Sequence, residues 1–143
     1  MTTNPRAKVR SYDSLVVGEQ ATFKRIIFEE DVAGFAALSG DYNPLHTDDV
    51  YAKTTHFGSK VVHGLYLGSL VSRLVGMELP GRYALLVKES LEFKKPVTVG
   101  DTVVVSGTLV QKSDATKLIR VDVIITVADA IVVQGEVIVQ VLK

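Results

Sequence analysis

The most apolar stretch of the chain, VVHGLYLGSLVSRLVGM at residues 61–77, has the pattern of a buried helix. Apolar side chains repeat around most of the helical circumference, which is typical of a helix enclosed by protein. These positions are Leu65, Leu67, Leu70, Val71, Leu74 and Val75. The glycines and serines between them lower helix propensity. Their small size instead allows another backbone, such as that of a sheet, to pack closely on the helix. We predict a helix from about Gly64 to Gly76, terminated by Pro80 and Gly81.

Alternation of apolar and polar residues predicts strands in the second half of the chain. The predicted strands cover residues 83–95, 102–110, 119–127 and 133–141, with a tight connection at Asp129 and Ala130. In the first of them the odd positions are expected to face the core: Tyr83, Leu85, Val87, Leu91 and Phe93. Glu89 falls on the same side and breaks the pattern, which the alternation does not explain.

The first half of the chain predicts one strand and two short helices ahead of the long helix. The strand begins in the β-branched and aromatic run after Gly18. A helix follows from Glu29, ended by Gly40, with an expected apolar face of Val32, Phe35, Ala36 and Leu38. Thr47 is expected to cap a second helix that ends near Ala52. One long helix among antiparallel strands implies an α+β domain whose sheet curls around the helix.

The length and the net charge of the chain indicate its number of domains and exclude some classes of binding partner. A chain of 143 residues without internal repeats is the size of one domain. We expect a flexible N-terminal arm over residues 1–14 and a single domain over 15–143. The formal net charge is zero and the charged residues are scattered, so the basic footprint of a nucleic-acid or anionic-membrane binder is missing from the sequence.

The absence of cysteine and of a targeting signal bears on the compartment. Without cysteine there is no disulfide framework and no thiol nucleophile, which fits a reducing compartment. The polar N-terminus lacks the apolar segment of a signal peptide. Residues 61–77 are too short and too rich in glycine and serine to span a bilayer comfortably. We therefore expect a cytoplasmic protein without a membrane segment.

Three polar residues suited to acid–base chemistry sit in the loop SGDYNPLH: Asp41, Asn43 and His46. A carboxylate and an imidazole that hold one water can remove a proton from it and return a proton to a substrate, since imidazole exchanges protons near neutral pH. Asn43 can orient either partner. The free N–H groups at a helix start near Gly64 suit a negatively charged oxygen, such as that of a thioester enolate.

Two other interpretations of these polar residues stay open on spacing alone. In an ordinary turn, Asp41 and Asn43 would bond the backbone and His46 would be a surface residue. A metal could be held by His56 and His63 with nearby aspartates, but no pair has a recurrent ligand spacing, so we expect no metal. His63 is better explained as a helix-start residue packed on the loop.

Several motifs resemble the MaoC-like (R)-specific enoyl-CoA hydratases, also called hydratase 2. The resemblance rests on FAALSGDYNPLH at 35–46, on FGSKVVHGLYLGSL before and within the predicted helix, and on LEFKKPVTVGD at 91–101. It extends from about Gly18 to Val141. It implies a hot-dog fold, in which a five-stranded antiparallel sheet wraps a central helix, and homodimers with a CoA-thioester site between subunits. No cofactor is implied.

The resemblance also implies roles for individual residues. Asp41 and His46 would activate the water, Asn43 would orient them, and the Gly64 N–H would form the oxyanion hole. The substrate is expected to lie near Tyr42, Pro44, Leu45, His63, Leu65 and Phe93.

The implied reaction is reversible (R)-specific hydration of trans-2-enoyl-CoA. A dehydratase of (R)-3-hydroxyacyl groups on acyl carrier protein would use the same chemistry with another carrier. A non-catalytic acyl-CoA-binding module would not need Asp41, Asn43 and His46 together, and a thioesterase would cleave the thioester instead. Acyl chain length depends on how far the pocket extends under the helix, which the sequence does not reveal.

Overall fold

The computed structural model describes residues 5–143 as one α+β domain with five strands and four α-helices in this part of the chain. The strands are β1 (Gln20–Ile26), β2 (Ala84–Phe93), β3 (Thr102–Ser113), β4 (Leu118–Val127) and β5 (Ala130–Val141). The helices are α1 (Glu29–Ser39), α2 (Pro44–Thr47), α3 (Asp49–Thr54) and α4 (Gly64–Met77). No helix within residues 5–143 is long and apolar enough to cross a bilayer.

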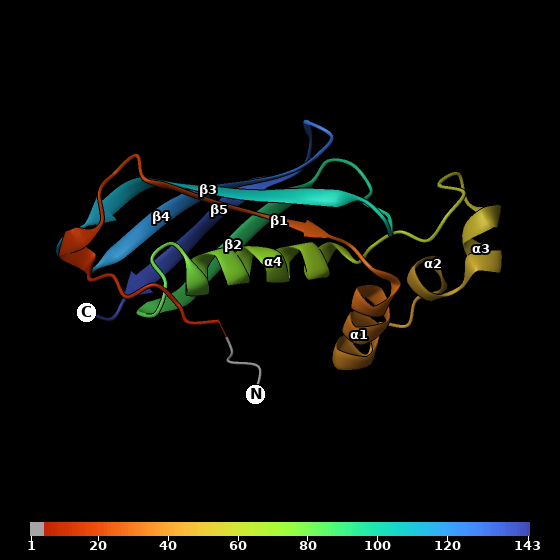
Figure 1. Ribbon diagram of the computed structural model, residues 1–143, viewed down its shortest axis with the longest axis horizontal. Coiled ribbons are helices and arrows are strands. Elements are labelled where there is room, and N and C mark those ends of the chain that lie inside the picture. Colours follow the sequence, from red (N-terminus) through yellow and green to blue (C-terminus); the bar gives the residue numbers. More distant parts are fainter. Residues whose placement is uncertain (1–4) are drawn as a thin grey trace.

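The five strands form one antiparallel sheet in the order β1-β3-β4-β5-β2. Strands β3, β4 and β5 follow one another directly, and β1 and β2 are the two edges. The turn between β4 and β5 is centred on Ala128 and Asp129, both with positive φ, so the connection expected at Asp129 and Ala130 begins one residue earlier. Figure 1 shows the sheet as a layer over α4, with α1, α2 and α3 beyond one end of that helix.

Helix α4 confirms the predicted buried helix and packs on the inner face of the sheet. Leu74 and Val71 are fully buried in it, and they meet the inward valines of β3, β4 and β5 in a single core. The prediction that protein encloses the apolar side chains of this helix is wrong at Leu65, which is 69% exposed. Leu38 on α1 was likewise expected to be buried and is 85% exposed. Both exposed leucines lie at the end of the molecule where the short helices gather.

A bulge in β2 changes which of its residues face the core. Leu86 pairs with Val139 and Lys88 with Ile138, so Val87 is the extra residue. After the bulge the inward positions are odd, and Glu89 lies opposite the buried Val137. The expectation that Leu85 and Val87 face the core is therefore wrong, since they are 51% and 56% exposed. Glu89 keeps the inward direction that the alternation predicted, so its carboxyl is an acid on the inner face of the sheet.

The segment between β1 and α4 has more helix than predicted. Gly40 ends α1 in the left-handed conformation, as expected from its sequence. The cap of α3 is Asp48, whose carboxylate accepts the N–H groups of Val50 and Tyr51, and not Thr47 as expected. Thr47 instead closes the separate turn α2, which lies inside the predicted loop.

The predicted flexible arm over residues 1–14 differs from the structure where it is described. Tyr12 is 3% exposed, and its N–H donates to the Lys143 carbonyl at 2.7 Å. The Arg10 guanidinium bonds both carboxylate oxygens of Glu19. Residues 8–14 are thus packed on the domain, because an aromatic ring and an ion pair hold them there. Residues 1–4 of the predicted arm lie outside the described part.

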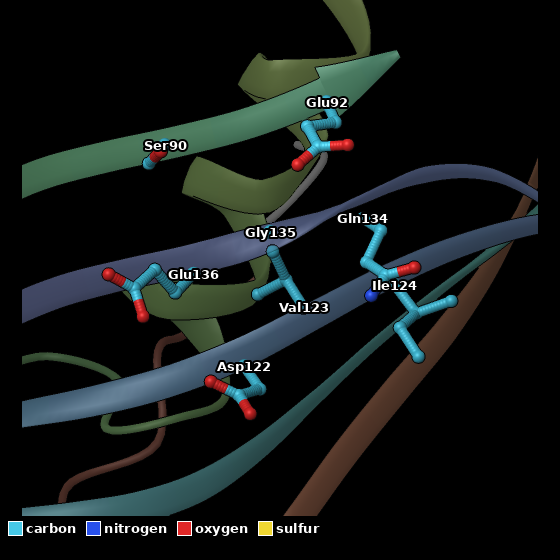
Figure 2. A pocket seen from close by; sticks show the side chains of 8 residues that line it. All are labelled: Ser90, Glu92, Asp122, Val123, Ile124, Gln134, Gly135 and Glu136. Carbon is cyan, nitrogen blue, oxygen red and sulfur yellow. The ribbon is translucent and has the colours of Figure 1, made fainter. Parts of the chain in front are cut away.

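A hollow of about 320 Å³ lies on the outer face of the sheet, opposite α4. Figure 2 shows the outward side chains of β2, β4 and β5 around it, among them the carboxylates of Glu92, Asp122 and Glu136. Gly135 sits at its centre and has no room for a side chain, since a Cβ there would meet the Ser90 carbonyl at 1.9 Å. The close approach of β2 and β5 therefore requires glycine at this position.

Candidate active site

The loop that carries the polar motif is held by its own side chains. The Asn43 side-chain oxygen accepts the Leu45 N–H at 3.0 Å and caps α2, with Pro44 in the first helical position. The Asp41 Oδ1 atom accepts the Asn43 N–H at 3.2 Å. These local bonds are the ones that an ordinary turn would make, and they set the direction of Asp41 and of the helical turn that carries His46.

Two groups define the face of the loop where proton transfer can occur. The His46 Nδ1 atom lies 2.6 Å from the Val61 carbonyl, so Nδ1 donates and Nε2 keeps its lone pair. That Nε2 atom lies 4.0 Å from Asp41 Oδ2. This separation is too long for a direct hydrogen bond and suits one water bound to both groups. The arrangement brings two proton acceptors to a single position.

His63 ties this loop to the start of α4, as the sequence predicted. Its ring is 2% exposed, and Nε2 lies 3.0 Å from the Asp41 carbonyl oxygen. The ring stacks on His46 with centroids 3.9 Å apart and packs against Phe35 at 4.9 Å. His63 therefore holds both the backbone of Asp41 and the imidazole of His46 in place.

Asp41, His46 and His63 each offer a ligand atom, and these atoms lie within 4.8 Å of one another. The two imidazoles are stacked with 25° between their planes, so the lone pairs in those planes run side by side and do not converge on one ion. His46 Nδ1 and His63 Nε2 already bond carbonyl oxygens. This geometry favours a hydrogen-bonded network over a metal centre.

A cavity of about 310 Å³ opens beside His46 and reaches the start of α4. It is lined by His46, Phe57, Val61, Val62, Gly64, Leu67, Phe93, Lys94, Lys95, Pro96 and Val97. Gly64 is the first residue of α4, and N–H groups of the first turn have no partner within a helix. A Cβ on Gly64 would lie 3.1 Å from the Phe93 ring, so glycine leaves the donor accessible next to an aromatic wall.

The structure brings some predicted residues together and separates others. His46, Gly64 and Phe93 share the cavity, with Asp41 and His63 adjoining it through His46. Tyr42 lines a smaller cavity of about 220 Å³ on the α1 side of His46. The exposed Leu65 lies outside both linings, so its predicted contact with substrate stays a prediction.

Two other predicted site residues, Pro44 and Leu45, have backbone roles in the structure. Pro44 begins α2, and the Leu45 carbonyl accepts the Val61 N–H at 3.1 Å. Val61 thus bonds the loop twice, and no sequence motif pointed to this role. Phe57 and Leu67 were also missed as lining residues, because apolar residues in a loop and in a core helix look alike in sequence.

Comparisons with known proteins identify the family of this chain. A family model described as MaoC like domain matches residues 5–130. The (R)-specific enoyl-CoA hydratase of Aeromonas caviae is 42% identical over 134 residues, covering 91% of this chain and 98% of the relative. A mitochondrial 3-hydroxyacyl-[acyl-carrier-protein] dehydratase of Arabidopsis thaliana is 35% identical over 97 residues, covering 68% of this chain and 57% of the relative.

Among solved structures, an (R)-hydratase from A. caviae involved in PHA biosynthesis superimposes with a TM-score of 0.86 at 39% identity. The match covers 90% of this chain and 98% of that one. The fold predicted from the resemblance is thereby confirmed as a hot-dog fold. Sequence and structure together show that the chain belongs to the MaoC-like family.

Proposed function

We propose that this protein catalyses the reversible (R)-specific hydration of trans-2-enoyl-CoA. The observation that carries the proposal is the 4.0 Å separation of His46 Nε2 and Asp41 Oδ2, with His46 also lining the cavity at the start of α4. A water between two proton acceptors and a helix N-terminus for a developing negative charge are what addition to an enoyl thioester needs.

The proposed reaction uses these groups in sequence. The water held by Asp41 and His46 loses a proton to one of them while its oxygen bonds to C3 of the enoyl group. The C2–C3 π electrons shift toward the thioester oxygen, where the Gly64 N–H stabilises the negative charge. The abstracted proton then passes to C2, so all atoms of the water end on the product. The reverse sequence is dehydration.

The carrier of the acyl group is proposed to be CoA. The relative named as an enoyl-CoA hydratase matches 91% of this chain, whereas the acyl-carrier-protein dehydratase matches 68%. Lys94 and Lys95 border the cavity and supply positive charge for a phosphate-bearing carrier of either kind. Turnover on matched CoA and acyl-carrier-protein substrates separates the two, and a preference for the protein carrier would contradict the proposal.

Crotonyl-CoA tests the reaction class directly. We expect its enoyl absorbance to fall without release of free thiol, because water adds to the double bond and the thioester survives. Chiral analysis of the hydrolysed product should give the (R)-3-hydroxy acid. Thiol release would indicate a thioesterase, and binding without either change would indicate an acyl-CoA-binding module.

We propose a homodimer joined through the edge strand β2. Within residues 5–143 this strand is unpaired on one side and exposes three apolar side chains: Leu85 at 51%, Val87 at 56% and Phe93 at 49%. An unpaired edge with exposed apolar side chains favours pairing with a strand of another subunit. The cavity borders the end of the same strand, so a second subunit would lie next to the site.

The proposed compartment is the cytoplasm, because a chain without cysteine fits a reducing environment.

Val87→Lys is expected to yield monomers and lower the hydration rate, because it places a charge at the centre of the proposed dimer interface. Analytical ultracentrifugation at micromolar concentration measures the first effect. Ile26→Lys is the matched control, since Ile26 is 48% exposed on the opposite edge strand β1. A wild-type monomer with full activity would refute the shared site.

A further inference from the structure

The carboxyl group of Glu89 is an inward-facing acid that the proposed proton transfer does not use. It lies on β2 opposite α4, where Oε2 is 3.2 Å from the position that a Cβ on Gly68 would occupy. Its other oxygen, Oε1, is buried and has no hydrogen-bond partner among residues 5–143. Burial raises the pKa of this carboxyl. An unsatisfied buried oxygen destabilises a fold, so its position calls for an explanation.

Glu89 lies at the far end of a seam that begins at the cavity. Gly64 and Gly68 are four residues apart and therefore share one face of α4. The first faces the Phe93 ring and the second faces Glu89 and Leu91, all on β2. Because neither glycine has a side chain, the helix and the strand are separated only by the β2 side chains. Four residues of helix, about 6 Å along its axis, separate the proposed oxyanion donor from the level of Glu89.

Along this face of α4 the cavity lining ends at Gly64, Leu67 and Phe93, and beyond it the side chains of Leu91 and Glu89 close the seam. An acyl chain held by its thioester at Gly64 and extending along α4 would meet these side chains. A short chain would end before Glu89 and leave the carboxyl in place. A longer chain would push against the carboxyl and add apolar atoms around a group that is already partly buried, and an unpaired carboxylate in apolar surroundings is unfavourable. The inward carboxyl thus opposes long chains both by its volume and by its charge.

We propose that Glu89 is a specificity-determining residue that restricts the acyl group to short chains. The inference rests on the proposed hydratase function and adds the substrate class to it. The unpartnered oxygen is then the consequence of placing an acid where the acyl path would otherwise continue beside Gly68.

The test compares kcat/KM for crotonyl-CoA and trans-2-octenoyl-CoA. The wild type is expected to favour crotonyl-CoA. In Glu89→Ala the octenoyl-to-crotonyl ratio should rise at least about tenfold, since contacts of single methylene groups in a pocket are worth roughly 10- to 200-fold. Glu89→Gln keeps the side-chain volume but removes the charge, so the ratio should rise as well, by less.

Glu136→Ala is the matched control, because it removes a carboxylate from the outer face of the same sheet (Figure 2) and should leave the ratio unchanged. An unchanged ratio in folded Glu89→Ala overturns the inference, as does a wild type that prefers octenoyl-CoA. If Glu89→Ala does not fold, the ratio in Glu89→Gln decides in the same way. A wild type that hydrates neither substrate refutes the proposed function itself, which distinguishes the two failures.

Discussion

Asp41→Asn and His46→Gln are each expected to leave the protein folded and to lower hydration turnover about a hundred- to ten-thousand-fold, the usual contribution of a positioned proton-transfer group. Both residues lie on the loop and its short turn, away from the core, and the Asp41 side chain is 51% exposed. Their removal is therefore expected to affect the proposed water between His46 Nε2 and Asp41 Oδ2 more than it affects packing. Turnover of crotonyl-CoA and thermal melting measure the two effects separately.

The double variant Asp41→Asn with His46→Gln should lose little more turnover than the less active of the two single variants, because both residues act on one water in the proposed reaction. Asp49→Asn and His56→Gln are matched controls at exposed positions outside the cavity, and they should retain the wild-type rate. Near-wild-type turnover in either single variant would show that the catalytic assignment is wrong.

Gly64→Val is expected to lose about 3–4 kcal/mol of transition-state stabilisation, the effect of removing one oxyanion donor. The new Cβ would lie 3.1 Å from the Phe93 ring, and the branched side chain would fill the space beside the Gly64 N–H. The helix should persist, because valine has slightly higher helix propensity than glycine. Hydration rate and melting temperature are measured on the same preparation.

Gly76→Val is the control for this substitution, since Gly76 lies near the other end of α4 and a Cβ there meets nothing within 4 Å. It should keep both activity and stability. A folded Gly64→Val protein with an unchanged rate would remove Gly64 from the site. A sharp fall in melting temperature would instead show that Gly64 is small for packing.

The order and type of the main elements could be predicted from local pattern. Period and length identified α4, and alternation identified β4 and β5, because each of these elements buries one regular set of side chains. Strand β2 was the exception. Its bulge at Val87 arises from pairing with β5, so the outward directions of Leu85 and Val87 depend on a partner strand about fifty residues away in the chain.

The candidate site divides in the same way. Asp41, Asn43 and His46 could be proposed from one short motif, since their spacing keeps them on one loop. Which His46 nitrogen carries the proton depends on the Val61 carbonyl, and the space beside Gly64 depends on Phe93 of another element. Neither contact produces a repeating pattern of apolar and polar residues from which it could be predicted.

By itself, then, the sequence determined the class of fold and the loop that carries Asp41, Asn43 and His46, because periodicity and turn chemistry are local properties. The tertiary structure decided the positions that depend on contacts between distant segments: the exposure of Leu65, the tautomer of His46 and the outward directions of Leu85 and Val87. Strand register and helix packing select these among alternatives that local propensity leaves equivalent.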